Sequence, residues 1–130
     1  GGRVVNFKGR MAGIFEEAIC AIQKEHPIYL LGGFGGASAQ IVKLMKGETT
    51  AEKLFEEAKN NEDYKSLIEY CQMNCLPTIN YDELKKFENN DYQILRNGLD
   101  KDENEILFNS INIPEIISLI LKGINKVSNY

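Results

Sequence analysis

Residues 28–46 read IYLLGGFGGASAQIVKLMK, and this stretch decides the predicted fold. It opens with a short apolar run, residues 28–32, which follows Pro27 and ends in glycine. Such a run is typical of a strand that is buried on both faces of a parallel sheet. A glycine-rich turn, GGFGGAS, comes next, and a helix is predicted over residues 38–46 with Gly47 as its stop. The order of strand, glycine turn and helix indicates an open α/β fold.

The residues before this stretch form a second glycine-rich region. Eight of the eleven glycines lie within the first 36 residues. Residues 1–11, GGRVVNFKGRM, predict a loop, and residues 12–25 predict an amphipathic helix. Apolar residues recur in that helix at helical spacing, at Phe15, Ala18, Ile19 and Ile22. Pro27 ends the helix, because the residue before a proline disfavours the helical conformation.

The residues after the glycine turn predict a polar, helical back half. Residues 48–105 are rich in acidic and amide side chains. A helix is predicted after Thr50 as its N-cap, and others around residues 64–71 and 102–109. A strongly apolar last helix starts at Pro114. We expect its apolar stripe to pack against the sheet; the stripe consists of Ile113, Ile117, Ile120, Leu121 and Ile124.

A single strand does not make a sheet, and two helices beside one buried strand imply further strands. We therefore expect residues 1–130 to be the C-terminal part of one α/β domain with a Rossmann-like open parallel sheet. Residues 48–105 are then an acidic helical insertion in its helical back half. The alternative is a helical domain built around one strand.

Composition excludes several classes of protein. The chain has 130 residues, of which 43% are apolar and 26% are charged, and this suits one small soluble domain or part of a larger one. No apolar run reaches the roughly 18 residues that cross a bilayer. A net charge of −4 disfavours binding to nucleic acid. Three cysteines and one histidine do not form a standard zinc site, so we expect no metal and mostly buried, reduced thiols in a cytoplasmic protein.

The turn GGFGGAS is one candidate for binding phosphate. Glycine lets the backbone approach a phosphate closely, and the N-terminus of the following helix offers unpaired N–H groups. Gly33 and Gly35 fit the first two positions of a dinucleotide-binding fingerprint, and Ser38 stands where a third glycine or alanine is expected. Phe34 and Gly36 lie in the same turn. The alternative is a tight strand-to-helix turn that binds nothing.

The region before the first helix is the other candidate. Three cations precede the helix start at Gly13, namely Arg3, Lys8 and Arg10. Cations beside a helix N-terminus suit a phosphate or pyrophosphate. Glu16 and Glu17, one turn further on, are placed to bind ribose hydroxyls or to stabilise a developing oxocarbenium ion. The alternative is that the cations are solvated and the glutamates favour the helix start.

Three stretches together resemble a known superfamily. These are GGR with the following GRMAGIFEEAICAI, then HPIYLLGGFGGASAQ, and finally NGLDKDENEILFNSINIPEIISLILKGI. They resemble the C-terminal half of SLOG-type Rossmannoid domains, a superfamily that includes the Lonely-guy (LOG) phosphoribohydrolases, the DNA-processing protein DprA and the N-terminal domain of TRPM channels. The most similar branch is the prokaryotic one found beside TIR or sirtuin-like NADase domains in phage-defence systems. The resemblance covers residues 1–45 and about 95–124.

The resemblance implies a site and a function. In the LOG pattern PGGxGTxxE, Gly1 and Gly2 match the paired glycines, Gly13 the later glycine, and Glu16 or Glu17 the acidic residue. The implied function is sensing of a nucleotide-derived ligand, such as ADP-ribose or cyclic ADP-ribose, by a self-associating domain. That domain would need no other cofactor and would regulate an NADase-type effector, in the same or another chain, in anti-phage defence. The implied ligand-binding residues are Gly2, Arg3, Lys8, Arg10, Gly13, Gly33, Phe34, Gly35, Gly36 and Ser38.

Two other functions are weighed against sensing. One is a LOG-like or deoxyribosyltransferase-like enzyme that cleaves the N-glycosidic bond of a nucleotide, with Glu16 or Glu17 as the catalytic carboxylate. An insertion, RVVNFKGRMA, separates the glycine pair from the helix, in contrast to the LOG pattern. The other is a structural or oligomerisation module whose glycine turns bind no ligand.

Overall fold

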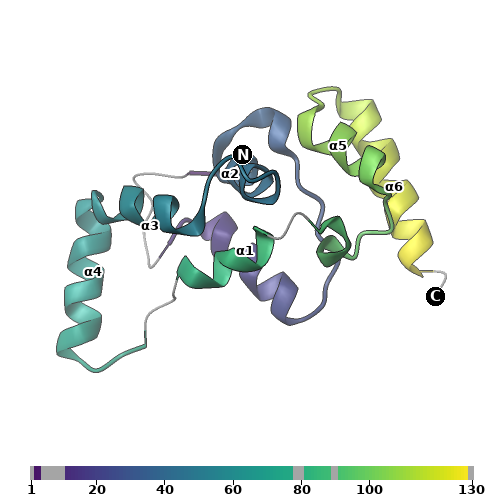
Figure 1. Ribbon diagram of the computed structural model, residues 1–130. Helices are drawn as coiled ribbons and strands as arrows, with labels where there is room; N and C mark the ends of the chain where they lie inside the picture. The colour runs from purple at the N-terminus through teal and green to yellow at the C-terminus, as the bar shows by residue number, and fades with distance from the viewer. Residues whose placement is uncertain (1, 4–10, 78–80, 89–90, 129–130) are drawn as a thin grey trace.

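The computed structural model describes residues 2–3, 11–77, 81–88 and 91–128, and most of these residues form helices, which loops join (Figure 1). The elements follow in the order α1 (Gly13–Gln23), η1 (Gly32–Phe34), α2 (Gly36–Met45), α3 (Ala51–Lys59), α4 (Glu62–Met73), η2 (Tyr81–Phe87), η3 (Tyr92–Leu95), α5 (Lys101–Asn109) and α6 (Ile113–Ser128), where η marks a short 3₁₀ helix. Helices α1 and α2 lie centrally, α3 and α4 to one side, and α5 and α6 to the other (Figure 1).

The predicted open parallel sheet is wrong, because the described residues contain no strand. The apolar run at residues 28–31 lies beside residues 95–97 instead of beside another strand. The Ile28 N–H donates to the Leu95 carbonyl at 2.8 Å, and the Asn97 side-chain amide donates to the Ile28 carbonyl at 2.9 Å. A strand needs a ladder of backbone bonds to a neighbour, and here a loop and a side chain satisfy Ile28. The run is apolar because Ile28 and Leu30 are buried in a helical core.

The predicted helices are confirmed with small shifts of their ends. Helix α1 covers most of the predicted residues 12–25, and α2 starts two residues before the predicted 38–46. The Thr50 side chain caps α3, since its Oγ1 accepts from the Lys53 N–H at 3.2 Å. The acidic region 48–105 shares the main core, to which Leu54, Leu84 and Phe87 contribute buried side chains.

An aromatic cluster joins α3 and α4 to the centre of the molecule. The ring of Tyr81 lies 6.4 Å from that of Phe15, 5.6 Å from Phe55 and 6.2 Å from Tyr64, measured between ring centroids. Burial raises the pKa of Tyr81 far above its usual value. The cluster therefore connects α1, α3, α4 and η2 through apolar and aromatic contact.

Two predictions about side-chain burial are wrong. The stripe of the last helix is not covered, because Ile113, Ile117, Leu121 and Ile124 are 44–56% exposed. No sheet exists among the described residues to cover it. The thiols are not mostly buried either, since Cys71 is buried whereas Cys20 and Cys75 are exposed. Within the described ranges, no helix has the length and apolar character needed to span a bilayer.

Candidate functional site

Gly2 lies between the first turns of α1 and α2. The Ala37 N–H, in the first turn of α2, donates to the Gly2 carbonyl at 3.0 Å. A Cβ added to Gly2 would lie 3.3 Å from Cβ of Ile14, in the first turn of α1, and 3.4 Å from that of Ala37. Gly2 also has a φ of +90°, which glycine adopts readily. The structure thus brings the first glycine region and the starts of both helices together.

Both of these helix starts lack a side-chain cap. Ala12 precedes α1 and Gly35 precedes α2, and neither has a side chain that accepts a bond from the first turn. The first N–H groups of a helix have no intrahelical partner, and the helix dipole adds positive partial charge there. A Cβ added to Gly13 or Gly35 would meet no heavy atom of the described residues within 4 Å, so among those residues the space beside both helix starts is open. Such an arrangement can accommodate an anion.

The turn GGFGGAS divides into a packed half and an open half. A Cβ on Gly32 would lie 2.5 Å from the Phe108 carbonyl oxygen, and one on Gly33 would lie 2.9 Å from that of Asn109. These glycines therefore allow close contact with the end of α5, and Gly33 faces carbonyl oxygens, which do not attract an anion. Gly35 and Gly36, by contrast, have φ of +72° and +70° at the entry to α2, and a Cβ on Gly35 would meet no described heavy atom within 4 Å.

The two candidate carboxylates occupy different faces of α1. Glu17 is exposed, and it follows Ile14 by three residues and Gly13 by four, so it shares their side of the helix. Glu16 is half-buried and lies in the first turn. Glu17 is therefore the carboxylate on the side of α1 that faces Gly2.

The remaining predicted residues are placed as follows. Arg3 is exposed and directly follows Gly2, Phe34 is half-exposed, and Ser38 is half-buried in the first turn of α2. Lys8 and Arg10 lie outside the described residues. The structure thus brings the starts of α1 and α2 together at Gly2.

Comparison with known families identifies the family of the chain. The family model described as SLOG cluster2 matches residues 1–107, which include both glycine regions and the starts of α1 and α2. The chain belongs to the SLOG family. Membership indicates a nucleotide-related domain. Neither the curated proteins nor the solved structures contain a match.

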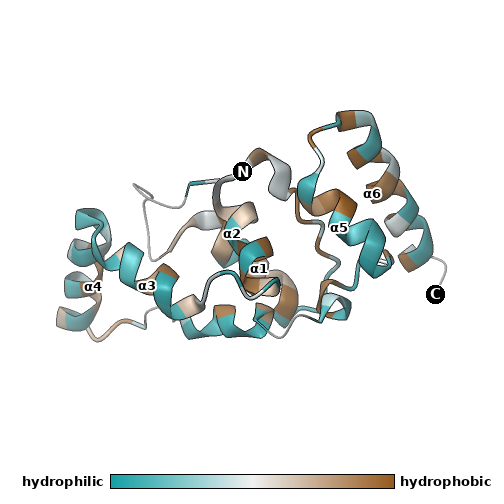
Figure 2. Ribbon diagram, turned by 45° about the horizontal axis from the view of Figure 1, so that its top comes forward, coloured by the Kyte–Doolittle hydropathy of each residue, from teal (hydrophilic) through white to brown (hydrophobic). Residues whose placement is uncertain are grey.

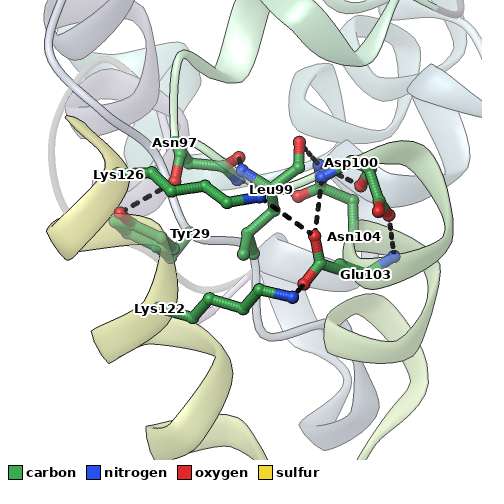
Figure 3. Close-up of polar contacts among 8 residues, drawn as sticks. All are labelled: Tyr29, Asn97, Leu99, Asp100, Glu103, Asn104, Lys122 and Lys126. Carbon is green, nitrogen blue, oxygen red and sulfur yellow. Dashed lines mark hydrogen bonds and ion pairs between the residues drawn. The ribbon is translucent and has the colours of Figure 1, made fainter. Parts of the chain in front are cut away.

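Sequence reasoning missed a buried polar cluster in this SLOG domain (Figure 3). Asn97 and Asn104 are only 2% and 0% exposed. The Asn97 side-chain amide donates to Asn104 Oδ1 at 2.8 Å as well as to the Ile28 carbonyl, and the Tyr29 hydroxyl donates to the Asn97 carbonyl at 3.0 Å. Polar groups buried to this degree need such partners. We call Tyr29, Asn97, Asn104 and Glu103 the Asn97 cluster.

The Asn97 cluster fastens α6 to the rest of the molecule. Glu103 belongs to a capping box with Asp100 at the start of α5, and its carboxylate also pairs with Lys122 of α6 (Figure 3). The Lys122 ammonium holds the pKa of Glu103 below its usual value. Gly123 packs beside these residues, because a Cβ there would lie 2.8 Å from Cε1 of Tyr29. The capping box Asp-x-x-Glu is readable from sequence, whereas the buried asparagine pair is not.

Helices α5 and α6 therefore hold both ends of the segment that leads to the glycine turn. Tyr29 contacts Asn97 and Gly123 at one end, and Gly33 lies against the end of α5 at the other. The turn at Gly35 and Gly36 follows directly. The position of this turn depends on how α5 and α6 are docked.

Proposed function

We propose that this SLOG domain binds a nucleotide-derived ligand, of the ADP-ribose or cyclic ADP-ribose class, by its phosphates. The observation that carries the proposal is the meeting at Gly2 of two helix starts whose N-cap residues, Ala12 and Gly35, supply no side-chain acceptor. One helix N-terminus can bind a phosphate through its N–H groups and dipole. Two of them brought together at Gly2 suit a diphosphate better than a single phosphate.

The other predicted residues take supporting roles in this proposal. Gly13, Gly35, Gly36 and Ser38 line the two helix starts, and the cations Arg3, Lys8 and Arg10 add charge for the phosphates. Glu17 binds ribose hydroxyls, because it lies on the Gly2 side of α1. Gly33 supports the turn by packing against α5 and does not touch the ligand.

Sensing is proposed in preference to catalysis. The Asn97 cluster and Gly33 join the glycine turn to α5 and α6, so a ligand that shifts the turn changes the docking of both helices. This is how binding would regulate an attached or partner effector of the NADase type, and the resemblance to defence-associated SLOG domains supports that role. An N-glycosidic hydrolase using Glu16 or Glu17 is the second candidate, favoured by the exposure of Glu17.

Thermal unfolding tests the proposal directly. A ligand at about 100 times its dissociation constant adds about 2.7 kcal/mol to stability, which raises the midpoint by several degrees in a domain of this size. We expect ADP-ribose or cyclic ADP-ribose to do this, and ribose, which lacks phosphate, not to. If none of the phosphorylated compounds shifts the midpoint, the proposal is wrong.

A matched pair of variants locates the ligand. Gly13→Asp places a carboxylate at the start of α1, where space is open and where a negative charge favours the helix. It should abolish the ligand-induced shift without lowering the midpoint of the free protein. Gly13→Asn has the same shape without the charge and should keep most of the shift. The enzyme would be favoured instead if the wild-type protein released nicotinamide from NAD and the Glu17→Gln variant did not.

A further inference from the structure

The buried Asn97 is followed by Gly98, and no other asparagine in the sequence precedes a glycine. This pair is chemically reactive, because glycine has no side chain to hinder attack by its backbone nitrogen on the neighbouring amide. In deamidation the Gly98 nitrogen bonds to Cγ of Asn97, the Cγ–Nδ2 bond breaks, and ammonia leaves with the Gly98 amide proton. Water then opens the cyclic imide at either carbonyl and leaves aspartate or isoaspartate at position 97.

Hydrogen bonds restrain the Asn97 side chain against this reaction in the folded chain. Nδ2 of Asn97 donates to the Ile28 carbonyl at 2.9 Å and to Asn104 Oδ1 at 2.8 Å. Oδ1 of Asn97 accepts from the Leu99 N–H at 3.1 Å. The side chain is 2% exposed and has a partner at each of its polar atoms. Attack by Gly98 requires the amide to turn toward its own backbone, which the three hydrogen bonds oppose.

Helix α6 packs directly on the backbone of the reactive pair. A Cβ on Gly98 would lie 2.6 Å from the Gly123 carbonyl oxygen, and the Asn97 carbonyl oxygen lies against Gly123 in turn. Lys122, one residue earlier in α6, pairs with Glu103 of the Asn97 cluster (Figure 3). Cyclisation bends the backbone between the two residues of the pair, and the docked α6 leaves little room for this change.

Few contacts oppose the local opening of α6. Among its 16 residues, all of which the structure describes, only Ile116 and Gly123 are buried. The helix forms one edge of the molecule in both views, with hydrophobic residues exposed along it (Figures 1 and 2). Elements with few buried apolar contacts open at a lower free energy than the whole domain. We therefore expect α6 to detach at times while the main core stays folded.

We propose that Asn97 and Gly98 form a deamidation site that the docked α6 keeps unreactive and that an opening of α6 exposes. The reaction is a one-way switch, because oxygen in place of Nδ2 removes two donated hydrogen bonds. It also points negative charge at two acceptors, the Ile28 carbonyl and Asn104 Oδ1. A buried charge without donors is strongly unfavourable, so α6 and the Asn97 cluster do not close again. Isoaspartate in addition lengthens the backbone beside Gly98.

Peptide mapping by mass spectrometry tests the site, with the whole chain incubated at mildly alkaline pH in the presence and absence of denaturing urea. In urea we expect Asn97 to deamidate faster than any other asparagine, because the cluster is lost. In the folded protein the same residue should react at least about tenfold more slowly. Equal rates at Asn97 in both conditions, or a faster reaction at another asparagine in urea, would overturn the proposal. The measurement needs no nucleotide, so its result is independent of ligand binding.

Two pairs of variants test whether α6 controls the rate. Gly123→Ala forces α6 outward, because its Cβ would collide with the residues on which α6 packs, and it should accelerate deamidation of Asn97 severalfold. Ser118→Ala, at an exposed position of α6, should keep the wild-type rate. Lys122→Met removes the ion pair between α6 and α5 and should also accelerate the reaction, whereas Lys59→Met, which removes an ion pair within α3, should not. A wild-type rate in both Gly123→Ala and Lys122→Met would overturn the role of α6.

The variant Asn97→Asp tests the switch itself, because it carries one product of the reaction. Amide hydrogen exchange should show that α6 loses its protection while α1 and α2 keep theirs. Wild-type protection of α6 in this variant would contradict the switch. Loss of protection in every helix would contradict it as well, because the effect of the reaction would then be the unfolding of the whole domain.

Discussion

Replacing Gly123 by alanine tests how α6 is docked. On helix propensity alone this change should stabilise the protein by about 1 kcal/mol, because glycine is unfavourable inside a helix. The structure predicts the opposite sign. A Cβ at this position would lie 2.8 Å from Cε1 of Tyr29 and 2.9 Å from its hydroxyl oxygen, and closer still to the Asn97 carbonyl oxygen. These distances are too short for a carbon atom, so α6 or Tyr29 must move.

The expected loss follows from these contacts. Overpacking of a filled site costs about 1–3 kcal/mol. Displacement of the Tyr29 hydroxyl from Asn97 removes a hydrogen bond of about 1 kcal/mol. After the gain in helix propensity, a net loss of about 1–3 kcal/mol remains, which lowers the melting midpoint by several degrees.

Urea denaturation followed by circular dichroism measures this difference. Gly13→Ala is the matched control, because it makes the same change in a helix where a Cβ meets no heavy atom of the described residues within 4 Å. We expect Gly13→Ala to leave the midpoint unchanged or raise it, and Gly123→Ala to lower it. If both variants gain stability equally, α6 is not packed against Tyr29 and Asn97 as described.

Three further predictions concern the same connections. Gly35→Ala should destabilise the protein by about 1–3 kcal/mol by strain alone, because φ of +72° with ψ of −158° is a conformation restricted to glycine; an unchanged urea midpoint would contradict it. Asn97→Leu should lower the free energy of unfolding by about 2–4 kcal/mol, because it leaves the Ile28 carbonyl and Asn104 Oδ1 without their donor. A loss of less than about 0.5 kcal/mol would refute the buried network. Glu103→Gln should lower stability near neutral pH. The pKa of Glu103 is depressed in the folded state, so its contribution to the free energy of unfolding is present above the ordinary pKa of 4.5 and is lost as the pH falls below it. The denaturation curves of the wild type and the variant should therefore converge in acid. Curves that diverge in acid would contradict this prediction.

The helices could be predicted from sequence because their signals are local. Thr50 and Pro114 mark helix starts by capping and ring geometry, and the helices begin within a residue of each. The run at residues 28–31 could not be assigned in the same way. A short apolar segment has the same composition whether it pairs in a sheet or crosses a helical core, and only the contact with residues 95–97 decides.

The candidate site was predicted in part for the same reason. That both glycine regions lie at helix starts follows from sequence, and the structure brings these starts together at Gly2. The different roles of the glycines in the turn GGFGGAS could not be predicted. Gly33 is glycine because it contacts α5 closely, and Gly35 is glycine because of its positive φ. The sequence alone does not distinguish these two reasons. The uncovered stripe of α6 shows that periodicity identifies an apolar face but not what packs on it.

A nuclear magnetic resonance titration tests the central claim most directly. In a uniformly ¹⁵N-labelled sample, ADP-ribose is added and the backbone amide shifts are followed residue by residue. The account predicts that the largest changes fall on Gly13 and Ile14 at the start of α1 and on Gly35 and Gly36 at the entry to α2. Changes concentrated elsewhere, or none at ligand concentrations that shift the melting midpoint, would contradict binding at the two helix starts.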